Sequence, residues 1–421
     1  YQREKELFFA SEMKALLALP MSREINLDAL AMYFQLNYLP TDKCMLQDVR
    51  KVKPGHFVQI KNQQIEEGCY YKIHIQSDKY AIHKYEDAQK HIEKLLANSV
   101  QERMISDVPL GAFLSGGIDS SVIVALAARY TDKLKTFTIG YKDNKLFDET
   151  YYANLVAQKY NTDHHVFYLS ETEFKEEVFH VLDYLDEPFA DSSCIPQYIL
   201  SKYTKQHVTV ALSGDGGDEV FAGYNKHGAE WMMRHNAPLS ILAKLSAPIL
   251  RKLPASKNTK IGNITRQLVK LGHGAQLSNA ERYIRWCSIL DEEEVCQLLS
   301  RSVQQQLHVE KLKQDNLKYA NSIQSNDFNE ILLADMQLIL PGDMLYKVDM
   351  MSMANSLEVR SPLLDYTLVD YAFQLPSHFK IDRKFKKKII QDTFRSYLPS
   401  ELYNRPKMGF EIPLLQWFRK D

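Results

Sequence analysis

The stretch Leu114-Ser115-Gly116-Gly117-Ile118-Asp119-Ser120-Ser121 decides the fold, because it lies where a short apolar strand passes into a helix. Its two glycines let the backbone approach a ligand closely, and the start of the helix presents N–H groups and the positive end of the helix dipole. The three serine hydroxyls add hydrogen-bond donors, so the loop is suited to pyrophosphate. It is not the Walker P-loop, because no Gly-Lys-[Ser/Thr] follows. One carboxylate, Asp119, is a suitable ligand for Mg²⁺. The plainer interpretation is a glycine turn in which Asp119 only favours the helix start.

A second glycine-rich stretch, Ala211-Leu-Ser213-Gly214-Asp215-Gly216-Gly217-Asp218-Glu219-Val-Phe-Ala-Gly223-Tyr224, also follows an apolar strand. The carboxyl ends of parallel strands meet at one edge of a sheet, where open α/β sheets bind ligands. We therefore expect the two loops to lie together, with Asp119 and Asp218 sharing one metal ion from opposite sides. The alternative is an acidic, glycine-rich surface turn.

Helices and short apolar strands alternate from about residue 85 to Gly223. The predicted strands are Leu110–Leu114, Leu134–Gly140, His165–Leu169 and His207–Leu212, and the predicted helices are Asp119–Tyr130, Glu149–Tyr160 and Ile195–Tyr203. Strands separated by helices of this length imply right-handed crossovers and a doubly wound parallel sheet. Beyond Gly223 the pattern is mainly helical.

The first ~75 residues have a different, mixed pattern. It predicts a strand at Leu7–Ala10, a helix over Leu27–Leu36 capped by Asn26, and a strand pair, His56–Ile60 and Gln64–Tyr71, after the turn at Lys53-Pro-Gly55. This segment looks like the tail of a larger sheet domain.

The two glycine-rich loops resemble known motifs. SGGIDSS at residues 115–121 is similar to the pyrophosphate loop of the ATP pyrophosphatases, which cut ATP between its α- and β-phosphates and adenylate a substrate. The second loop resembles the SGEGSDE(V/L)FGGY motif of asparagine synthetases. Five further segments resemble that family in the same order: Phe9–Leu16, Asp186-Glu-Pro188 with Asp191-Ser-Ser193, Leu357-Glu-Val-Arg360-Ser-Pro-Leu-Leu-Asp365, Lys387-Lys-Ile-Ile, and Arg405-Pro-Lys407-Met-Gly409-Phe410.

The resemblance implies an α/β fold of the ATP-pyrophosphatase (adenine nucleotide α-hydrolase-like) type with a helical C-terminal extension, preceded by a truncated α+β remnant of an N-terminal-nucleophile glutaminase. The expected domains are residues 1–76 and 77–421. The implied activity is that of a carbon–nitrogen ligase: ATP and Mg²⁺ activate aspartate as aspartyl-AMP with release of pyrophosphate. Ammonia, normally supplied by glutamine hydrolysis, then displaces AMP and leaves asparagine.

The same resemblance assigns roles to individual residues. Asp215 and Lys387 are the expected catalytic residues, and Asp119 and Asp218 the expected metal ligands. The expected nucleotide-binding residues are Leu114, Ser115, Gly116, Gly117, Asp119, Ser120, Ser121, Ile139, Ser213 and Gly214, of which Leu114, Ile139, Ser213 and Gly214 should line the adenosine pocket.

Two positions depart from the family pattern. Asp215 stands where well-known asparagine synthetases carry glutamate, so the side chain is one methylene shorter. The family's glutaminase domain begins with a nucleophilic cysteine, whereas this chain begins with Tyr1 and its earliest cysteine is Cys44. We therefore expect a fragment of a longer amidotransferase, active with ammonia. Two alternatives stay open: an amidotransferase acting on another carboxylate, such as an acidic sugar of a surface polysaccharide or a β-lactam precursor, and a non-catalytic ATP-binding scaffold.

Other candidate residues have plainer interpretations. The run Arg383–Lys388 is typical of a solvated basic face, and only Lys387 is distinguished by the family match. His164 and His165 are neighbours in a predicted strand and point to opposite faces, which argues against a shared metal. The aromatic residues Tyr151, Tyr152 and Trp286 are expected in the core.

Composition restricts the function classes. The chain has 421 residues, 45% of them hydrophobic and 25% charged, which is typical of globular protein of two to four domains. A net charge of -1 gives no global reason to bind nucleic acid or an anionic membrane. No apolar run of ~18 residues and no signal peptide is present, and five cysteines without CxxC spacing favour a reducing compartment. We expect a cytoplasmic enzyme whose partners are small-molecule substrates, with a homodimer as one assembly open to it.

Overall fold

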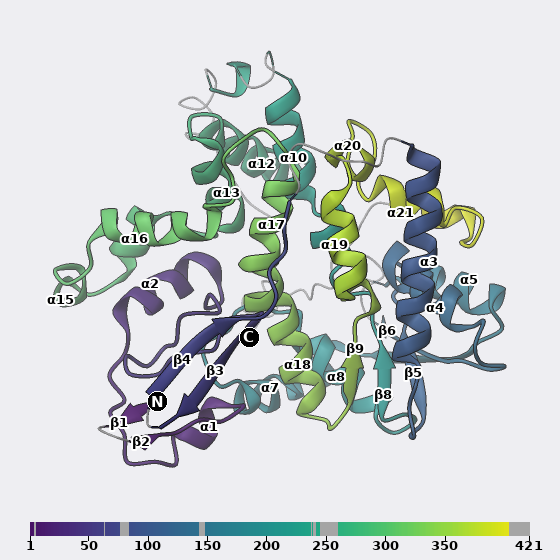
Figure 1. Cartoon of the computed structure of the whole chain (residues 1–421), viewed down its shortest axis with the longest axis horizontal. Coiled ribbons are helices and arrows are strands. Elements are labelled where there is room, and N and C mark those ends of the chain that lie inside the picture. The colour runs from purple at the N-terminus through teal and green to yellow at the C-terminus, as the bar shows by residue number, and fades with distance from the viewer. Residues whose placement is uncertain are drawn as a thin grey trace.

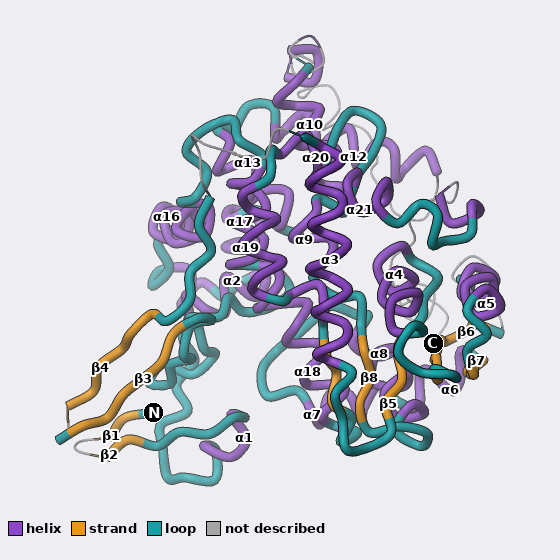
Figure 2. The backbone as a smooth tube through the Cα atoms, turned by 45° about the vertical axis from the view of Figure 1, so that its right-hand side comes forward, coloured by secondary structure: helices purple, strands orange, loops and turns teal. Residues whose placement is uncertain are grey.

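The structure is a computed structural model in which residues 1–3, 6–62, 64–75, 84–142, 148–236, 238, 241–244 and 260–403 are described. In Figures 1 and 2 the N-terminal hairpin lies apart from the main sheet, with helices α17 (Asn329–Gln337) and α18 (Leu345–Met353) between them. The motif at residues 405–410 and the expected domain boundary at 76/77 lie outside the described residues.

The main sheet has five parallel strands in the order β7-β6-β5-β8-β9. Their bounds are β5 (Leu110–Phe113), β6 (Lys135–Tyr141), β7 (Asp163–Leu169), β8 (Val210–Leu212) and β9 (Glu358–Arg360). β5 and β8 are neighbours in register, with Ala112 opposite Leu212. Both strands are almost wholly buried, which is why they read as continuous apolar runs rather than as alternating ones.

Helices cover the sheet on two faces. Right-handed crossovers place α4 (Ile118–Ala127) and α5 (Thr150–Lys159) on one face, because the chain moves from β5 through β6 to β7. The chain then returns across the sheet, so α8 (Cys194–Thr204) and its contact α18 cover the other face. The prediction of a doubly wound parallel sheet is confirmed. The direction of winding reverses between β5 and β8, and open sheets of this kind bind ligands at that switch point.

The remaining helices surround this core. They are α1 (Met13–Leu16), α3 (Tyr85–Arg103), α6 (Glu171–Glu176), α7 (Val178–Tyr184), α9 (Gly217–Phe221), α10 (Asn225–His235), α12 (Lys260–Gly274), α13 (Asn279–Cys287), α14 (Glu292–Leu298), α15 (Arg301–Gln304), α16 (Val309–Leu317), α19 (Tyr366–Gln374), α20 (Ser377–Lys380) and α21 (Lys388–Thr393), together with the 3₁₀ turns at Lys318–Ala320, Pro362–Leu364 and Ser400–Tyr403. A π-helical turn, Leu340–Met344, joins α17 to α18. No helix of the described residues is both long and apolar enough to cross a membrane.

The N-terminal segment holds two small sheets and one capped helix. Helix α2 (Leu27–Leu36) has the predicted bounds, and the side chain of Asn26 accepts a hydrogen bond from Ala29 N. The predicted strand pair is confirmed as the antiparallel hairpin of β3 (His56–Lys61) and β4 (Gln64–Cys69). The predicted strand Leu7–Ala10 is mostly wrong: β2 covers Glu6–Leu7 and pairs with β1 (Gln2–Arg3). Phe9 lies past the end of that ladder and is 84% exposed.

Three further expectations differ from the structure. β8 begins at Val210 rather than at His207, because the backbone of Val208 still bonds to Thr204 at the end of α8. β9 was not predicted, because its three residues lie in a mainly helical stretch and pair with β8 only through the tertiary fold. Tyr151 is 60% exposed, so its expected place in the core is wrong, while Tyr152 and Trp286 do pack inside.

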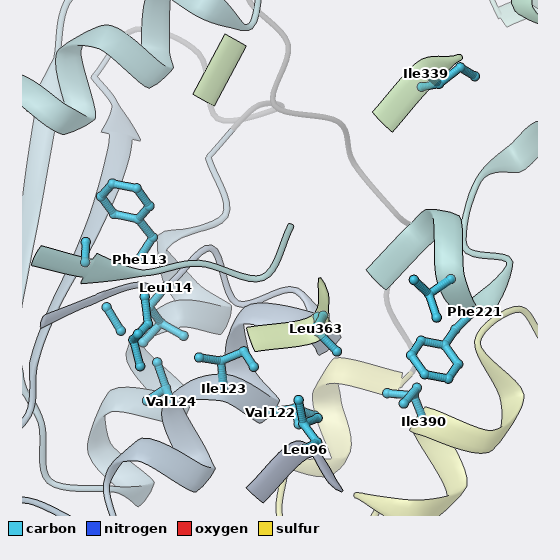
Figure 3. Close-up of a cluster of buried hydrophobic side chains, with 14 of the residues drawn as sticks. Leu96, Phe113, Leu114, Val122, Ile123, Val124, Phe221, Ile339, Leu363 and Ile390 are labelled. Atoms are coloured by element: carbon cyan, nitrogen blue, oxygen red, sulfur yellow. The ribbon is translucent and has the colours of Figure 1, made fainter. Parts of the chain in front are cut away.

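One hydrophobic core links the elements that bear the site. Leu114, Val122 of α4, Phe221 of α9 and Ile390 of α21 all belong to the same buried cluster, and Figure 3 shows Phe221 beside Ile390. Helices α9 and α21 contact one another, although they are far apart in sequence. The loops and the lysine that the sequence singles out therefore share a rigid support.

Candidate functional site

The first loop makes a tight turn from β5 into α4. Gly116 has φ +69°, the left-handed region that favours glycine. A Cβ atom at Gly116 would lie 2.6 Å from the backbone nitrogen of Ala153 in α5, so the turn also needs glycine for space. Leu114 extends the strand ladder by donating its N–H to Phe137 O at 2.8 Å, and its side chain is fully buried.

The serines of this loop bond within it. The hydroxyls of Ser115 and Ser120 lie 3.0 Å apart, and Gly117 N donates to Ser115 Oγ at 3.2 Å. Ser121 is fully buried in α4, and its hydroxyl has no hydrogen-bond partner among the described residues. In this structure two of the three hydroxyls therefore shape the loop.

The second loop packs directly against the first. Ser213 continues the β8–β9 ladder by donating its N–H to Arg360 O at 2.8 Å. A Cβ atom at Gly214 would lie 2.7 Å from Ser120 N, and one at Gly217 would lie 2.7 Å from the Asp119 carboxylate. The prediction that the two loops meet at one edge of the sheet is therefore confirmed.

Lys387 joins the two loops from a third element. Its ammonium forms ion pairs with Asp119 Oδ2 and, at 2.6 Å, with Asp218 Oδ1. We call Asp119, Asp218 and Lys387 the loop cluster. Burial alone would lower the pKa of Lys387, but the two carboxylates outweigh it and raise the pKa above its ordinary value. Lys387 is 7% exposed although Arg383 and Lys384 nearby are exposed, which separates it from the solvated basic run.

The loop cluster contains the carboxylate ligands that a hard divalent cation prefers. Asp119 and Asp218 bring carboxylate oxygens to one point, and Mg²⁺ is ordinarily held by one or two carboxylates together with substrate phosphates. No group of three or more His, Cys, Asp and Glu side chains suited to a metal occurs among the residues that the structure describes. Any metal at this edge would therefore depend on the two aspartates and on a bound substrate.

Asp215 interacts electrostatically with the loop cluster and with Lys347 of a second charged group. Burial raises its pKa above the ordinary range, with smaller raising effects from Asp119 and Asp218, while Ser213 and Lys347 lower it. Its carboxylate is therefore closer to a usable base than a solvated aspartate would be.

The second charged group forms on helices. Lys347 of α18 donates to Asp191 Oδ2 at 2.7 Å and to Ser193 Oγ at 2.7 Å. Asp343 of the π-helical turn is the next carboxylate; burial, and then Asp191, raise its pKa to about 7, although Lys347 opposes this. The Asp343 Oδ1 atom is buried and has no hydrogen-bond partner among the described residues. We call Asp191, Ser193, Asp343 and Lys347 the helix cluster.

The sequence analysis missed Lys347 and Asp343. The motif around Asp191 was identified, but its lysine partner comes from a distant helix. The π-helical turn contains Pro341-Gly342, and such turns often lie at functional sites. That dipeptide within an otherwise helical pattern is the sequence signal that was available.

A buried polar network supports the second loop from behind. Glu219, next to Asp218, accepts a hydrogen bond from Tyr224 Oη at 2.5 Å, and burial followed by the charge of Asp218 raises its pKa to about 8. Further in, Asp335 accepts from His227 Nε2 at 2.7 Å. Lys226 and Tyr283 also donate to Asp335. These contacts fix α9 and α10 to α17.

Ile139, His164 and His165, which the sequence analysis also considered, lie in or beside the main sheet. Ile139 is buried in β6, which continues to Tyr141 rather than ending at Ile139, and it lies beyond the last β5 pairing, Phe113 with Phe137. A ring nitrogen of His164 is 2.8 Å from Thr136 Oγ1, and the ring of His165 stacks on Phe137 at 5.3 Å.

The segment before the helix cluster contacts the N-terminal region. Asp186 accepts hydrogen bonds from the backbone of Met13 and Lys14, at the start of α1. Glu187 accepts from Met45 N at 2.7 Å and forms an ion pair with Lys51. The segment Asp186–Ser193 therefore joins the N-terminal region to the site.

Comparison with known proteins agrees with this geometry. The asparagine synthase family model matches residues 91–421, and a glutamine amidotransferase domain model matches residues 1–71. The chain is 30% identical to asparagine synthetase [glutamine-hydrolyzing] 1 of Bacillus subtilis, over 99% of this chain and 64% of that protein. It is 31% identical to a putative asparagine synthetase [glutamine-hydrolyzing] of Mycobacterium bovis, over 97% of this chain and 62% of that protein.

A solved structure of NMN synthetase from Francisella tularensis overlaps with TM-score 0.26 and 16% identity, covering 48% of this chain and 92% of that one; a likeness this low carries no argument.

Two loops at the switch point of a doubly wound sheet define the chain as an α/β protein with a candidate ligand site at the carboxyl edge of β5 and β8. Within that class, the asparagine synthase family model matches residues 91–421, so the chain belongs to the asparagine synthase family. The chain spans less than two thirds of the length of the two relatives named above.

Proposed function

We propose that the protein catalyses the ATP-dependent amidation of aspartate to asparagine through an aspartyl-AMP intermediate, with nitrogen from glutamine or ammonia. The observation that carries this proposal is the loop cluster, in which Asp119, Asp218 and Lys387 meet where two glycine-rich loops touch. We also propose the division of the chain into residues 1–76, a glutaminase-type segment, and 77–421, the synthetase domain.

The chemical difficulty is charge, because a carboxylate must attack an anionic phosphate. Loop N–H groups and Lys387 supply positive charge at fixed positions, and such preorganised groups are the strongest single contribution in many enzymes. Magnesium held by Asp119 and Asp218 would neutralise further phosphate charge. The proposed phosphate-binding residues are Ser115, Gly116, Gly117, Ser120 and Ser121, and those around the adenosine are Leu114, Ile139, Ser213 and Gly214.

Asp215 is the proposed base for amide formation. Its raised pKa favours accepting a proton from ammonia after attack on the acyl-adenylate. The aspartate is one methylene shorter than the family's glutamate, so the loop must lie closer to the intermediate or use a bridging water. Either arrangement leaves Asp215 beside both charged clusters.

The helix cluster supports an amino acid as the acceptor. The carboxylates of Asp191, Asp343 and Asp215 all favour the charged form of Lys347 and raise its pKa, so carboxylates outnumber the ammonium at this position. An α-ammonium group would complement that excess, whereas an acidic sugar would add only negative charge. Aspartate carries the α-ammonium group together with the carboxylate to be activated.

A panel of acids tests this proposal. The chain is incubated with ATP, Mg²⁺ and ammonia, together with L-aspartate, succinate or glucuronate, and both pyrophosphate and the amide product are measured. We expect pyrophosphate and asparagine with aspartate, and at most traces with the other two acids. Equal amidation of glucuronate would favour the acidic-sugar alternative. Nucleotide binding without pyrophosphate release from any acid would favour a non-catalytic scaffold.

The cysteines agree with the proposed cytoplasmic location. All five are free thiols, and the most deeply placed ones, Cys44 and Cys194, have pKa values raised to about 12, chiefly by burial. Thiols of this kind are unreactive and persist in a reducing compartment.

A further inference from the structure

Lys387 occupies the point where the two aspartates of the loop cluster meet. Its ammonium contacts Asp119 and Asp218, and the residue is 7% exposed. The backbone of Lys387 has φ +51°, a region that residues other than glycine rarely adopt, just before α21 begins at Lys388. A conformation of this kind is unfavourable for a residue with a side chain and persists only where the surroundings impose it. The position of this ammonium is therefore built into the fold.

Glycines make room for this meeting. A Cβ atom at Gly223 would lie 1.8 Å from Asp218 Oδ1 and 2.0 Å from Lys387 Cε. Any other residue at Gly223 would separate the lysine from the aspartate. A Cβ atom at Gly217 would likewise lie 2.7 Å from the Asp119 carboxylate. Gly223 and Gly217 together therefore let two carboxylates and one ammonium share a single site.

Two carboxylates at one partly buried point repel each other, because water screens their charges less there than at an open surface. The ammonium of Lys387 offsets that repulsion. A divalent cation bound by both aspartates at this point would take the carboxylate oxygens that now contact Lys387, Asp119 Oδ2 and Asp218 Oδ1. Lysine and divalent cation therefore compete for the same ligands.

We propose that Lys387 is a resident counter-ion of the nucleotide-free protein. Its ammonium holds Asp119 and Asp218 together, a divalent cation displaces it from them, and the polyphosphate of the nucleotide then binds the displaced ammonium. This inference deepens the proposed function and rests on it for the identity of the ligands.

The competition has a thermodynamic consequence. A divalent cation alone must displace a buried ammonium that has no new partner, so it binds weakly. A polyphosphate supplies that partner, so cation and polyphosphate each strengthen the binding of the other by the same factor. The coupling passes through Lys387 and disappears when its charge is removed.

Binding of Mn²⁺ to the whole chain without nucleotide tests the competition, with free Mn²⁺ measured by electron paramagnetic resonance. Lys387→Met should bind Mn²⁺ roughly tenfold more tightly than wild type, an ordinary size for coupling between sites. Lys388→Met is the matched control, because this neighbouring lysine pairs with Asp392 at 3.1 Å instead. It should bind as wild type does. Adding Asp119→Asn to Lys387→Met should abolish the gain, which locates the ion. Equal or weaker binding by Lys387→Met would overturn the proposal.

Inorganic pyrophosphate tests the coupling. It should strengthen Mn²⁺ binding to wild type, after correction for the Mn²⁺–pyrophosphate complex in solution, and should do so much less in Lys387→Met. Equal strengthening in both proteins would show that the lysine does not link the two ligands.

Acetylation of the wild-type chain, followed by mass spectrometry, gives a test that needs no variant. Labelling of Lys387 should rise when Mn²⁺ binds alone and fall again when pyrophosphate is added. Bound Mn²⁺ with unchanged labelling would refute displacement. None of these measurements requires amide formation, so failure here and failure of the proposed synthetase activity remain distinguishable.

Discussion

The loop cluster and the helix cluster use the same residue types in different ways. Each places one buried lysine among carboxylates, and Asp215 interacts with both lysine-bearing groups. Lys387 stands in a left-handed conformation before a short helix, in space that glycines provide. Lys347 instead lies in the first turn of α18, which directly follows the π-helical turn. One lysine is positioned at a junction of loops and the other on a regular scaffold.

The difference shows that the backbone around a buried lysine determines whether its ammonium can be exchanged for another cation. In the loop cluster both aspartates form ion pairs with the lysine, so another cation must exchange with it. In the helix cluster one ammonium, that of Lys347, is near two carboxyl groups, those of Asp191 and Asp343. Burial raises the pKa of Asp343 to about 7 in spite of that ammonium. The first arrangement suits exchange of cations, and the second suits a fixed acceptor pocket that still attracts positive charge.

Removing either carboxylate of the loop cluster should have the largest effect. Asp119→Asn or Asp218→Asn should reduce pyrophosphate release by about 10²–10³-fold, since each removes a charge that organises the phosphate site. The assay is pyrophosphate release at several Mg²⁺ concentrations, with circular dichroism to verify folding. Near-wild-type turnover with unchanged Mg²⁺ dependence would contradict the shared-metal assignment.

Removing the lysine of the helix cluster should chiefly affect stability. Lys347→Met leaves Asp191 and Asp343 without their cation, and should cost about 3 kcal/mol of unfolding free energy. Urea unfolding measures this cost. The surface pair of Lys388 and Asp392 gives the control, because Lys388→Met should cost less than about 1 kcal/mol. Equal costs for the two variants would mean that the helix cluster is not a structural unit.

Substitution of Asp215 tests whether amide formation and pyrophosphate release depend on different residues. Asp215→Asn keeps the shape but removes the base, so amide formation should slow by about 10²-fold. Pyrophosphate release should slow less, because activation of the carboxylate depends on the loop cluster. Asp215→Glu should retain part of the activity. Single-turnover measurement of AMP, pyrophosphate and amide separates the steps, and full activity in Asp215→Asn would show a turn residue only.

Asp343 should give the smallest effect, seen as a pH dependence. Burial raises its pKa to about 7 in the folded protein, so the folded state holds a proton that the unfolded chain has released. Stability therefore falls as pH rises from about 4, the ordinary carboxyl value, towards 7. Asp343→Asn should lose less stability than wild type between pH 5 and pH 8, whereas the exposed-site variant Asp132→Asn should follow wild type. Parallel curves for Asp343→Asn and wild type would argue against this titration.

Local patterns in the sequence predicted four of the five strands of the main sheet and the turn from β5 into α4. Short apolar runs, glycine-rich turns and the Asn26 cap are local signals, and β5, α4 and α2 formed where those signals stand. β9 and the pairing of Lys347 with Asp191 were not predicted, because both depend on contacts between distant segments. A strand of three residues in a mainly helical stretch gives no local signal of the strand that it pairs with. A lysine on a helix likewise gives no local signal of its carboxylate partner.

The position of β9 has a consequence for how the chain is made. β8 ends at Leu212 and its outer neighbour begins only at Glu358, after a long helical stretch. At about 5–20 residues per second, synthesis leaves this strand edge without its partner for roughly 7–30 seconds. An unpaired edge is a template for wrong pairing between chains. We therefore expect folding yield during synthesis, rather than final stability, to be most sensitive to substitutions that slow assembly of the helices between them.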